Sequence, residues 1–374
     1  MLVPISLTSC NSTDFAITPE DPISFATTAD WPTATTNNSY SNLSIEAREL
    51  EEAKTNARSY YMKILYITVG GVGVPVNLLV IFVILFFRQM RRKPVNIFIL
   101  HQSLIDFCVC LVAILLPLLT SVDHLSSSLA KEVLCRLWIS AYILWALLTT
   151  SGYNLMFLSI ERYLAIIKPL KYNESKVMKR LPFLAVGMWI VIFVLSYPDA
   201  YYSTVINGIC QVYVNMSAFM AVFITPYYLV LAAIFPAAIM LFCYTSIGIS
   251  LARNKFEAHT SQNSTTGKTK KSLIKKAQVN ILQTCITLMV VFILCWVFNM
   301  VILGMYIAGN IASLQTDLYH ISVALVICNS CINPFVYTLR YREFKFHLKK
   351  LFCPKLVTSE TPPTLSTGDR SDTP

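Results

Sequence analysis

Seven long apolar stretches constrain this chain more than any other feature of its sequence. A helix needs roughly 20 apolar residues to cross a bilayer, and each stretch is that long. Of the 374 residues, 55% are hydrophobic and only 13% are charged, which is too apolar for a soluble protein of this length. We therefore predict seven membrane-spanning helices. They begin near Met62, Ile97, Val133, Leu181, Ala221, Val279 and Thr316.

Basic residues set the orientation, because short cytoplasmic linkers accumulate Lys and Arg. They gather in the first, third and fifth linkers and after the last stretch, including the run Lys268 to Lys276. The N-terminus is predicted to be extracellular and the C-terminus cytoplasmic, in a multi-pass protein of the plasma membrane. The net charge of +10 favours contact with the lipid bilayer surface and with protein partners, and no nucleic acid partner is expected.

The two ends of the chain differ in composition from the apolar bundle, which we place at residues 61–341. Residues 1–60 are rich in Ser, Thr, Asn and acids and predict a flexible extracellular tail. Residues 342–353 alternate basic and apolar side chains and predict an amphipathic helix on the inner membrane surface. Residues 354–374 predict a disordered cytoplasmic tail. Candidate glycosylation sites on the outer side are Asn11, Asn37, Asn42 and Asn215, and Cys353 suits palmitoylation.

Two polar motifs stand at the inner ends of spans, where a charge costs on the order of a few kcal/mol. Glu161, Arg162 and Tyr163 end the third span, and Asn333-Pro334-x-x-Tyr337 ends the seventh. With these motifs and the residues below, each in its own span, the chain from about Met62 to Cys353 resembles rhodopsin-like (class A) G-protein-coupled receptors, most closely neuropeptide-type or orphan members. The further matches are Asn77, Asp106, Trp189, Pro236, Tyr244, Phe292, Cys295, Trp296 and Asn329.

The resemblance implies an all-α bundle of seven transmembrane helices and a disulfide between Cys135 and Cys210. Cys135 precedes Arg162 by 27 residues, slightly more than the family spacing. Because a disulfide needs its Cα atoms within roughly 7 Å, the outer end of the third helix is expected to be shifted, bulged or unwound. Cys10 is left without a partner in this assignment.

A buried acid in the second span is the most informative polar group inside the bundle. Asp106 must be paired, protonated or bound to a cation. The resemblance implies an allosteric sodium ion, and the alternative is a polar network that tightens the bundle without metal. The expected ligands are Asp106, Ser151, Asn329 and Asn333.

The resemblance also implies which residues change their contacts when the receptor is activated. Arg162 is expected to pair with Glu161 at rest and to be released toward Tyr244 and Tyr337 for a G protein, although it could instead be a snorkelling anchor. Phe292 and Trp296 are the expected rotating aromatic pair, or simply helix packing. Phe298 replaces the family's proline, so the sixth helix should be straighter. Gly152 replaces a bulky residue beside Phe292.

Two charged residues that are missing from the outer half of the bundle restrict the possible class of ligand. Leu144 stands where amine receptors carry an aspartate, and Ile327 stands where opsins carry the retinal lysine. An aromatic, weakly acidic vestibule favours a neuropeptide, with a lipid or another small molecule as the alternative. The candidate ligand-binding residues are Leu144, Trp145, Asp199, Tyr228, Asn299 and Tyr319.

The function predicted from the sequence is therefore activation of a heterotrimeric G protein by an extracellular ligand. The Ser and Thr residues after Val357 are candidate sites for a receptor kinase and for arrestin binding, or they belong to a tail with no such role. A small transporter or channel is the alternative from another class, although the chain lacks internal repeats. No residue cluster with the spacing of an enzyme site is found, so no catalytic activity or cofactor is expected.

Overall fold

The computed structural model describes residues 36–212, 218–260, 268–307 and 316–352. Within these residues, seven helices are long and apolar enough to cross a membrane, which confirms the predicted number. Of the described residues, those from Ile64 onward belong to one compact unit and residues 36–63 to a second. The spans are Tyr60–Phe86, Pro94–Leu115, Ser128–Ile167, Glu174–Tyr201, Pro226–Leu251, Val279–Tyr306 and Asp317–Arg340.

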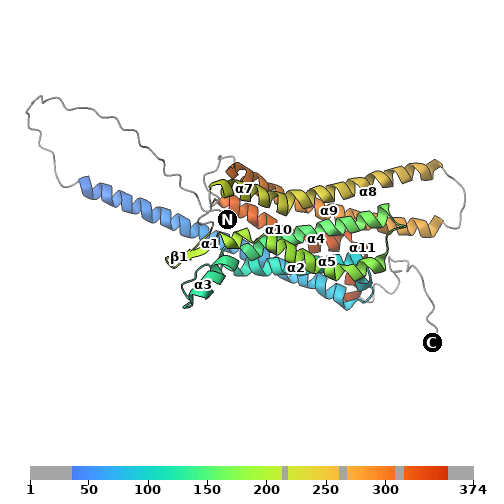
Figure 1. The fold of residues 1–374 in the computed structure, drawn as a ribbon, viewed down its shortest axis with the longest axis horizontal. Helices are drawn as coiled ribbons and strands as arrows, with labels where there is room; N and C mark the ends of the chain where they lie inside the picture. The colour runs from blue at the N-terminus through green and yellow to red at the C-terminus, as the bar shows by residue number, and fades with distance from the viewer. Residues whose placement is uncertain (1–35, 213–217, 261–267, 308–315, 353–374) are drawn as a thin grey trace, which may run out of the picture. The chain divides into compact units, whose positions relative to one another are not determined.

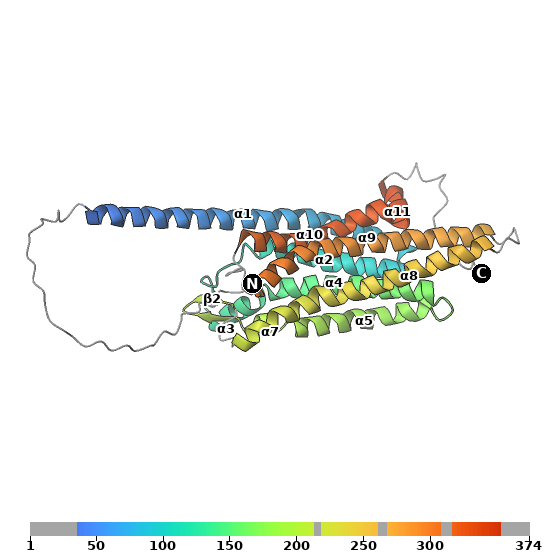
Figure 2. The same ribbon diagram turned by 90° about the horizontal axis from the view of Figure 1, so that it is seen from above.

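The third span lies in the middle of the bundle. In two perpendicular views α4 (Tyr142–Ile167) runs between α2 (Pro94–Leu115), α5 (Glu174–Leu195) and α8 (Phe235–Thr260) (Figures 1 and 2). The polar side chains that interrupt this span are buried: Thr149, Thr150, Ser151 and Asn154. A central position explains them, since neighbouring helices supply the partners that lipid cannot.

The outer end of the third span is irregular, as the spacing of Cys135 predicted. After α3 (Ser128–Leu134), the π-helical turn η2 covers Cys135–Ile139. Ala141 then adopts a left-handed conformation, with φ of 57°, immediately before α4 begins. A π turn takes up extra residues without ending the helix. The surplus between Cys135 and Arg162 is therefore absorbed at the end of the span that carries Cys135.

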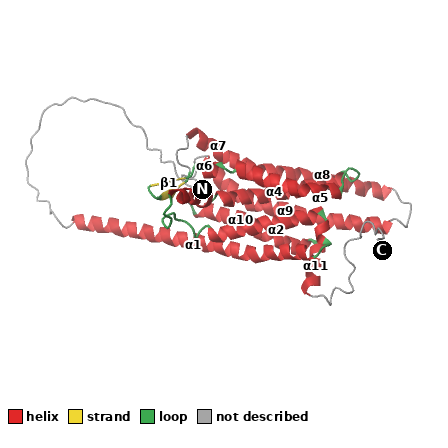
Figure 3. Ribbon diagram, turned by 60° about the horizontal axis from the view of Figure 1, so that its bottom comes forward, coloured by secondary structure: helices red, strands yellow, loops and turns green. Residues whose placement is uncertain are grey.

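A β-hairpin follows the fourth span and the short helix α6 (Pro198–Tyr201). Its strands β1 (Thr204–Ile206) and β2 (Ile209–Gln211) are antiparallel, and they lie among the few non-helical segments in Figure 3. Asn207 and Gly208 both have positive φ, at 52° and 82°. Two such residues form the turn that best matches strand twist. The hairpin was not predicted from the sequence.

The fifth and sixth spans differ in continuity. The fifth consists of α7 (Ala218–Leu229), the π turn η3 (Val230–Ile234) and α8, so the irregular turn ends just before Pro236. The sixth span lies in α9 (Lys268–Ile307), which has no proline and continues through Phe298. The expectation of an unkinked sixth helix agrees with this continuity, because no residue of α9 lacks a backbone donor.

The inner end of the bundle is held by contacts of α11 (Arg342–Phe352), which turns away from α10 (Asp317–Arg340) in Figure 2. Lys93 pairs with Glu343 at 3.1 Å. The Tyr341 hydroxyl lies 2.7 Å from Asn96 and 2.9 Å from Glu343, and burial together with the Glu343 carboxylate raises the pKa of Tyr341. Phe344 is fully buried while Lys349 and Lys350 are exposed, as an amphipathic helix requires.

The predicted extracellular tail needs one correction. α1 spans Thr36–Phe86, so residues 36–60 are helical and not a flexible coil, and Asn37 and Asn42 lie in this helix. Glu, Ala, Lys and Arg dominate the segment from Ile45 to Arg58, and these residues have high helix propensity. The other proposed modification sites, Asn11, Asn215 and Cys353, lie outside the described residues.

Candidate functional site

The arginine at the inner end of α4 is held in a closed ion pair. Nε and Nη2 of Arg162 both donate to the Glu161 carboxylate, and both side chains are buried. Tyr172, in the following linker, donates a third hydrogen bond to Glu161. Burial and this carboxylate raise the pKa of Tyr172, so its hydroxyl remains a donor. The neighbouring Tyr163 instead packs against Phe242, with ring centroids 6.0 Å apart and ring planes tilted by 41°.

The two tyrosines expected near Arg162 have other surroundings in this state. The Ser159 hydroxyl lies 2.7 Å from the Tyr244 hydroxyl and 2.8 Å from the Leu155 carbonyl oxygen. The buried Tyr337 hydroxyl has no hydrogen-bond partner among the described residues. It lies on α10 three residues after Pro334. The closed ion pair and these contacts correspond to a resting arrangement, and the active-state contact of the tyrosines with Arg162 stays a prediction.

Three aromatic rings link the centre of the bundle to α9. The Phe292 and Trp296 centroids are 5.6 Å apart, and Trp296 meets Trp145 of α4 edge to face at 6.4 Å. A Cβ atom on Gly152 would lie only 3.0 Å from the Phe292 ring. The absence of a side chain at Gly152 therefore makes room for Phe292, which is the contact that the sequence comparison suggested.

The carboxylate of Asp106 is surrounded by hydrogen-bond donors. It accepts from Ser151 at 2.9 Å and from Asn333 at 2.7 Å, two of the residues predicted for this site. A residue missed in the sequence, Gln102, donates to both carboxylate oxygens at 3.1 and 3.0 Å. The fourth predicted ligand, Asn329, is buried nearby in sequence on α10, and its amide oxygen has no partner among the described residues.

These donors do not fit a sodium ion bound to the carboxylate. An ionised carboxylate offers about four acceptor positions, and Gln102, Ser151 and Asn333 fill four. A cation would have to displace at least one of them to reach Asp106. The unpaired amide oxygens of Asn329 and Asn333 are suitable ligands, but without the carboxylate they bring no charge. The arrangement matches the alternative polar network, and the ion itself stays a prediction.

The predicted ligand-binding residues fall into three groups at the outer half of the bundle. Asn299 of α9 donates to Ser322 at 2.9 Å, and Ser322 donates to the Tyr319 carbonyl at 2.6 Å, which joins α9 to α10. Leu144 is buried on α4 and precedes Trp145, whose ring contacts Trp296. Tyr228 donates to the Ser196 carbonyl at 3.0 Å and also bonds with Asp199.

Asp199, one of the predicted ligand-binding residues, is 2% exposed and lies within α6. Tyr228 of α7 lies close enough to form a hydrogen bond with it, whereas the Tyr142 hydroxyl donates to the Phe193 carbonyl at 2.8 Å. A buried acid is a strong site for a cationic group, because desolvation strengthens any ion pair formed there.

The hairpin is fastened over the outer end of the third span. The predicted disulfide joins Cys135 to Cys210 with Cα atoms 5.4 Å apart. Glu132 accepts from the Thr204 hydroxyl at 2.9 Å and the Val205 amide at 3.1 Å, and Arg136 donates to Glu132 at 2.9 Å. Glu132 therefore holds the hairpin to the outer end of the third span.

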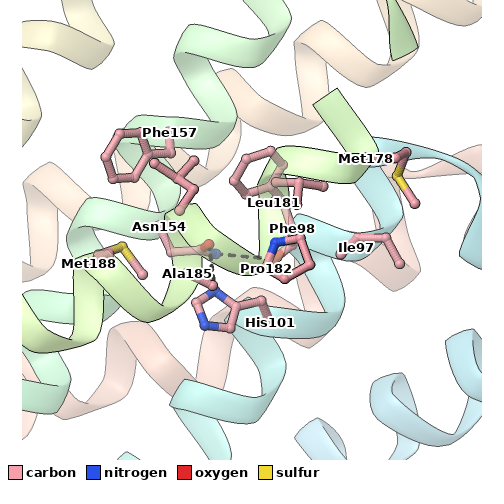
Figure 4. Close-up of a pocket in the computed structure, with 11 residues that line it drawn as sticks. Ile97, Phe98, His101, Asn154, Phe157, Met178, Leu181, Pro182, Ala185 and Met188 are labelled. Atoms are coloured by element: carbon pink, nitrogen blue, oxygen red, sulfur yellow. Dashed lines mark hydrogen bonds between the residues drawn. The ribbon is translucent and has the colours of Figure 1, made fainter. Parts of the chain in front are cut away.

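A cavity of about 290 Å³ lies elsewhere, between α2, α4 and α5 (Figure 4). His101 and Asn154 supply its polar atoms, while Phe98, Leu181 and Met188 are among its apolar walls. It was not predicted, and none of the predicted ligand-binding residues lines it.

Known proteins resemble the chain over most of its length. Residues 76–337 match the family described as 7 transmembrane receptor (rhodopsin family). Somatostatin receptor type 5 of Rattus norvegicus is 24% identical over 89% of this chain and 88% of its own length. Type-1 angiotensin II receptor B of Xenopus laevis is 25% identical over 85% and 87%. Galanin receptor 2a of Danio rerio is 27% identical over 76% and 75%.

The crystal structure of squid rhodopsin has the same fold, with a TM-score of 0.61 at 19% identity over 81% of this chain and 87% of that one. The matched residues include the Cys135–Cys210 disulfide and the Glu161–Arg162 ion pair. The seven spans are the number that the family description states. The matched region includes every span from the second to the sixth, the second part of the first span and most of the seventh. This chain belongs to the rhodopsin family of seven-transmembrane receptors.

Proposed function

We propose that the protein is a plasma-membrane receptor, with its N-terminus outside the cell, that binds a peptide and activates a heterotrimeric G protein. The observation that carries the ligand class is Asp199, a buried acid beside Tyr228 at the outer half of the bundle. An amino terminus or a basic side chain of a peptide would form a charged contact with this carboxylate.

Two further observations support a peptide over other ligands. Leu144 and Ile327 are both buried and apolar, so the positions that would pair an amine or bind retinal carry no charge. Three relatives are named as receptors for somatostatin, angiotensin II and galanin. The fastened hairpin at the outer end would leave a fixed entrance, which suits an extended ligand.

The signal would pass inward through the aromatic layer. Movement of Trp296 and Phe292 shifts α9, and the inner ends then separate enough for Arg162 to leave Glu161. Leu170 of the linker after α4 is completely exposed, and the run Lys268–Lys276 lies on the same predicted side of the membrane. Both are proposed contacts of the G protein. The Ser and Thr residues after Val357, outside the described residues, are proposed sites for a receptor kinase and arrestin.

The proposal is tested by applying peptide, lipid, amine and nucleotide libraries to cells that express the receptor, with second-messenger readout. Nucleotide exchange on a purified G protein, measured beside ion and solute flux, separates a receptor from a transporter. For an active peptide, Asp199→Lys should weaken the response roughly tenfold or more, because a close like-charge contact costs several kcal/mol. Asp123→Lys, in an exposed loop, is the matched control. Activation by lipids or amines alone would refute the peptide assignment.

A further inference from the structure

Gln102 occupies the place beside Asp106 that a cation would need. Its amide nitrogen lies 3.1 and 3.0 Å from the two carboxylate oxygens and 2.5 Å from the Ser151 hydroxyl. All three side chains are fully buried. A hard cation takes oxygen ligands at about 2.3–2.6 Å, so an ion shared by these same oxygens would overlap the amide group. Amide and cation are mutually exclusive.

The orientation of the Gln102 amide is fixed by a directed series of hydrogen bonds. Trp189 donates through Nε1 to Nε2 of His101 at 2.9 Å, so Nδ1 of His101 carries the proton. That proton faces Oδ1 of Asn154 at 2.9 Å, and Nδ2 of Asn154 donates to Oε1 of Gln102 at 2.7 Å. The remaining end of Gln102, its Nε2 group, can then only face Asp106.

Reversal of the Gln102 amide would be costly at both ends. The Nε2 donor of Gln102 would then face the Asn154 donor, and its Oε1 acceptor would face the Asp106 carboxylate, which also only accepts. Donor would oppose donor and acceptor would oppose acceptor in a buried site. Figure 4 shows the His101 ring and Asn154 joined at the wall of the cavity between α2, α4 and α5. His101 and Asn154 are therefore positioning residues that act on Asp106 through Gln102.

We propose that Gln102 replaces a sodium ion as the partner of Asp106, so that the resting receptor is stabilised by an internal amide and does not respond to sodium. The three donor side chains around Asp106 come from α2, α4 and α10, the helices that a central ion would otherwise connect. This proposal is independent of the ligand class and of the peptide assignment.

The test measures thermal unfolding of the purified full-length receptor in sodium chloride and in N-methylglucamine chloride at equal ionic strength. The wild type should unfold at the same temperature in both salts. Gln102→Leu removes the amide but keeps most of the volume, so sodium should gain access and raise its midpoint on the order of 2–4 °C. Adding Asp106→Asn to this variant should abolish the gain. Gln283→Leu, an exposed glutamine of α9, is the matched control and should show no sodium effect.

A second variant separates positioning from simple packing. Asn154→Leu leaves Gln102 intact but removes the donor that fixes its orientation, so partial sodium dependence should appear. Sodium stabilisation of the wild type that is lost in Asp106→Asn would overturn the proposal, and this comparison needs no Gln102 variant to fold. A folded Gln102→Leu receptor that ignores sodium would overturn it as well.

Discussion

Replacement of Gly152 by alanine should destabilise the receptor and raise its basal activity, because the new methyl group would enter space that Phe292 occupies. The added Cβ would lie 3.0 and 3.2 Å from two ring carbons of Phe292, which is closer than van der Waals contact. Phe292 is fully buried and touches Trp296, so its ring has little room to retreat. The ring must move by a few tenths of an ångström toward α9.

Two opposing effects set the size of the change. Alanine in a helix is favoured over glycine by about 0.8–1 kcal/mol, whereas overpacking a filled core costs about 1–3 kcal/mol. Gly187 and Gly248 are helical glycines with nothing within 4 Å of a built Cβ, so Gly187→Ala and Gly248→Ala report the first effect alone. Gly152→Ala should therefore fall below these controls by about 1–3 kcal/mol, or several degrees in unfolding temperature.

The clash exists only while Phe292 keeps its resting position. It therefore favours the active state, in which Phe292 and Trp296 are proposed to have moved. A bias of about 1 kcal/mol corresponds to roughly fivefold. Basal nucleotide exchange on a purified G protein should rise by about this factor for Gly152→Ala, and Phe292→Leu in the same chain should reverse both effects. A Gly152→Ala receptor as stable and as quiet as the Gly187→Ala control would refute the assignment of Phe292 and Gly152 as a packed pair.

Three other variants examine separate contacts. Cys135→Ser and Cys210→Ser should each reduce surface expression, and the double variant should be no worse than either one; additive losses would contradict the disulfide. Tyr172→Phe removes a donor to Glu161 and should raise basal exchange by roughly tenfold or more, since a hydrogen bond to a charged group contributes about 1.5–3 kcal/mol. Glu132→Ala leaves the hairpin fastened by the disulfide alone and should speed limited proteolysis of residues 204–211, with an unchanged digestion rate counting against its role.

The sequence predicted those features that depend on local pattern. Hydropathy located all seven spans. The separation of 27 positions from Cys135 to Arg162 predicted an irregular helix where the π turn lies. The hairpin carried a usable signal that was overlooked: Asn207-Gly208 between Thr204-Val205-Ile206 and Ile209 is a turn dipeptide flanked by β-branched residues.

Features that depend on the packing of several helices were harder to predict. Gln102 lies one helical turn before Asp106, so their contact was accessible from the spacing alone, but its hold on Ser151 and Asn154 requires α4 to be in place. The burial of Asp199 likewise follows from α6 folding inward against Tyr228 of α7, which no local pattern records.

The absence of a proline in α9 changes where motion can originate. Helices bend at prolines and at π turns, and here the π turns lie in the third and fifth spans, at Cys135–Ile139 and Val230–Ile234. α9 has neither device, so a displacement at its aromatic layer is carried to the inner end as a tilt of the whole helix. Phe292 lies about 36 Å along the axis from Lys268 at 1.5 Å per residue, so a tilt of roughly 6° moves that end by about 4 Å. The close packing of Phe292 on Gly152 thus places the pivot against α4, the helix that also carries Arg162.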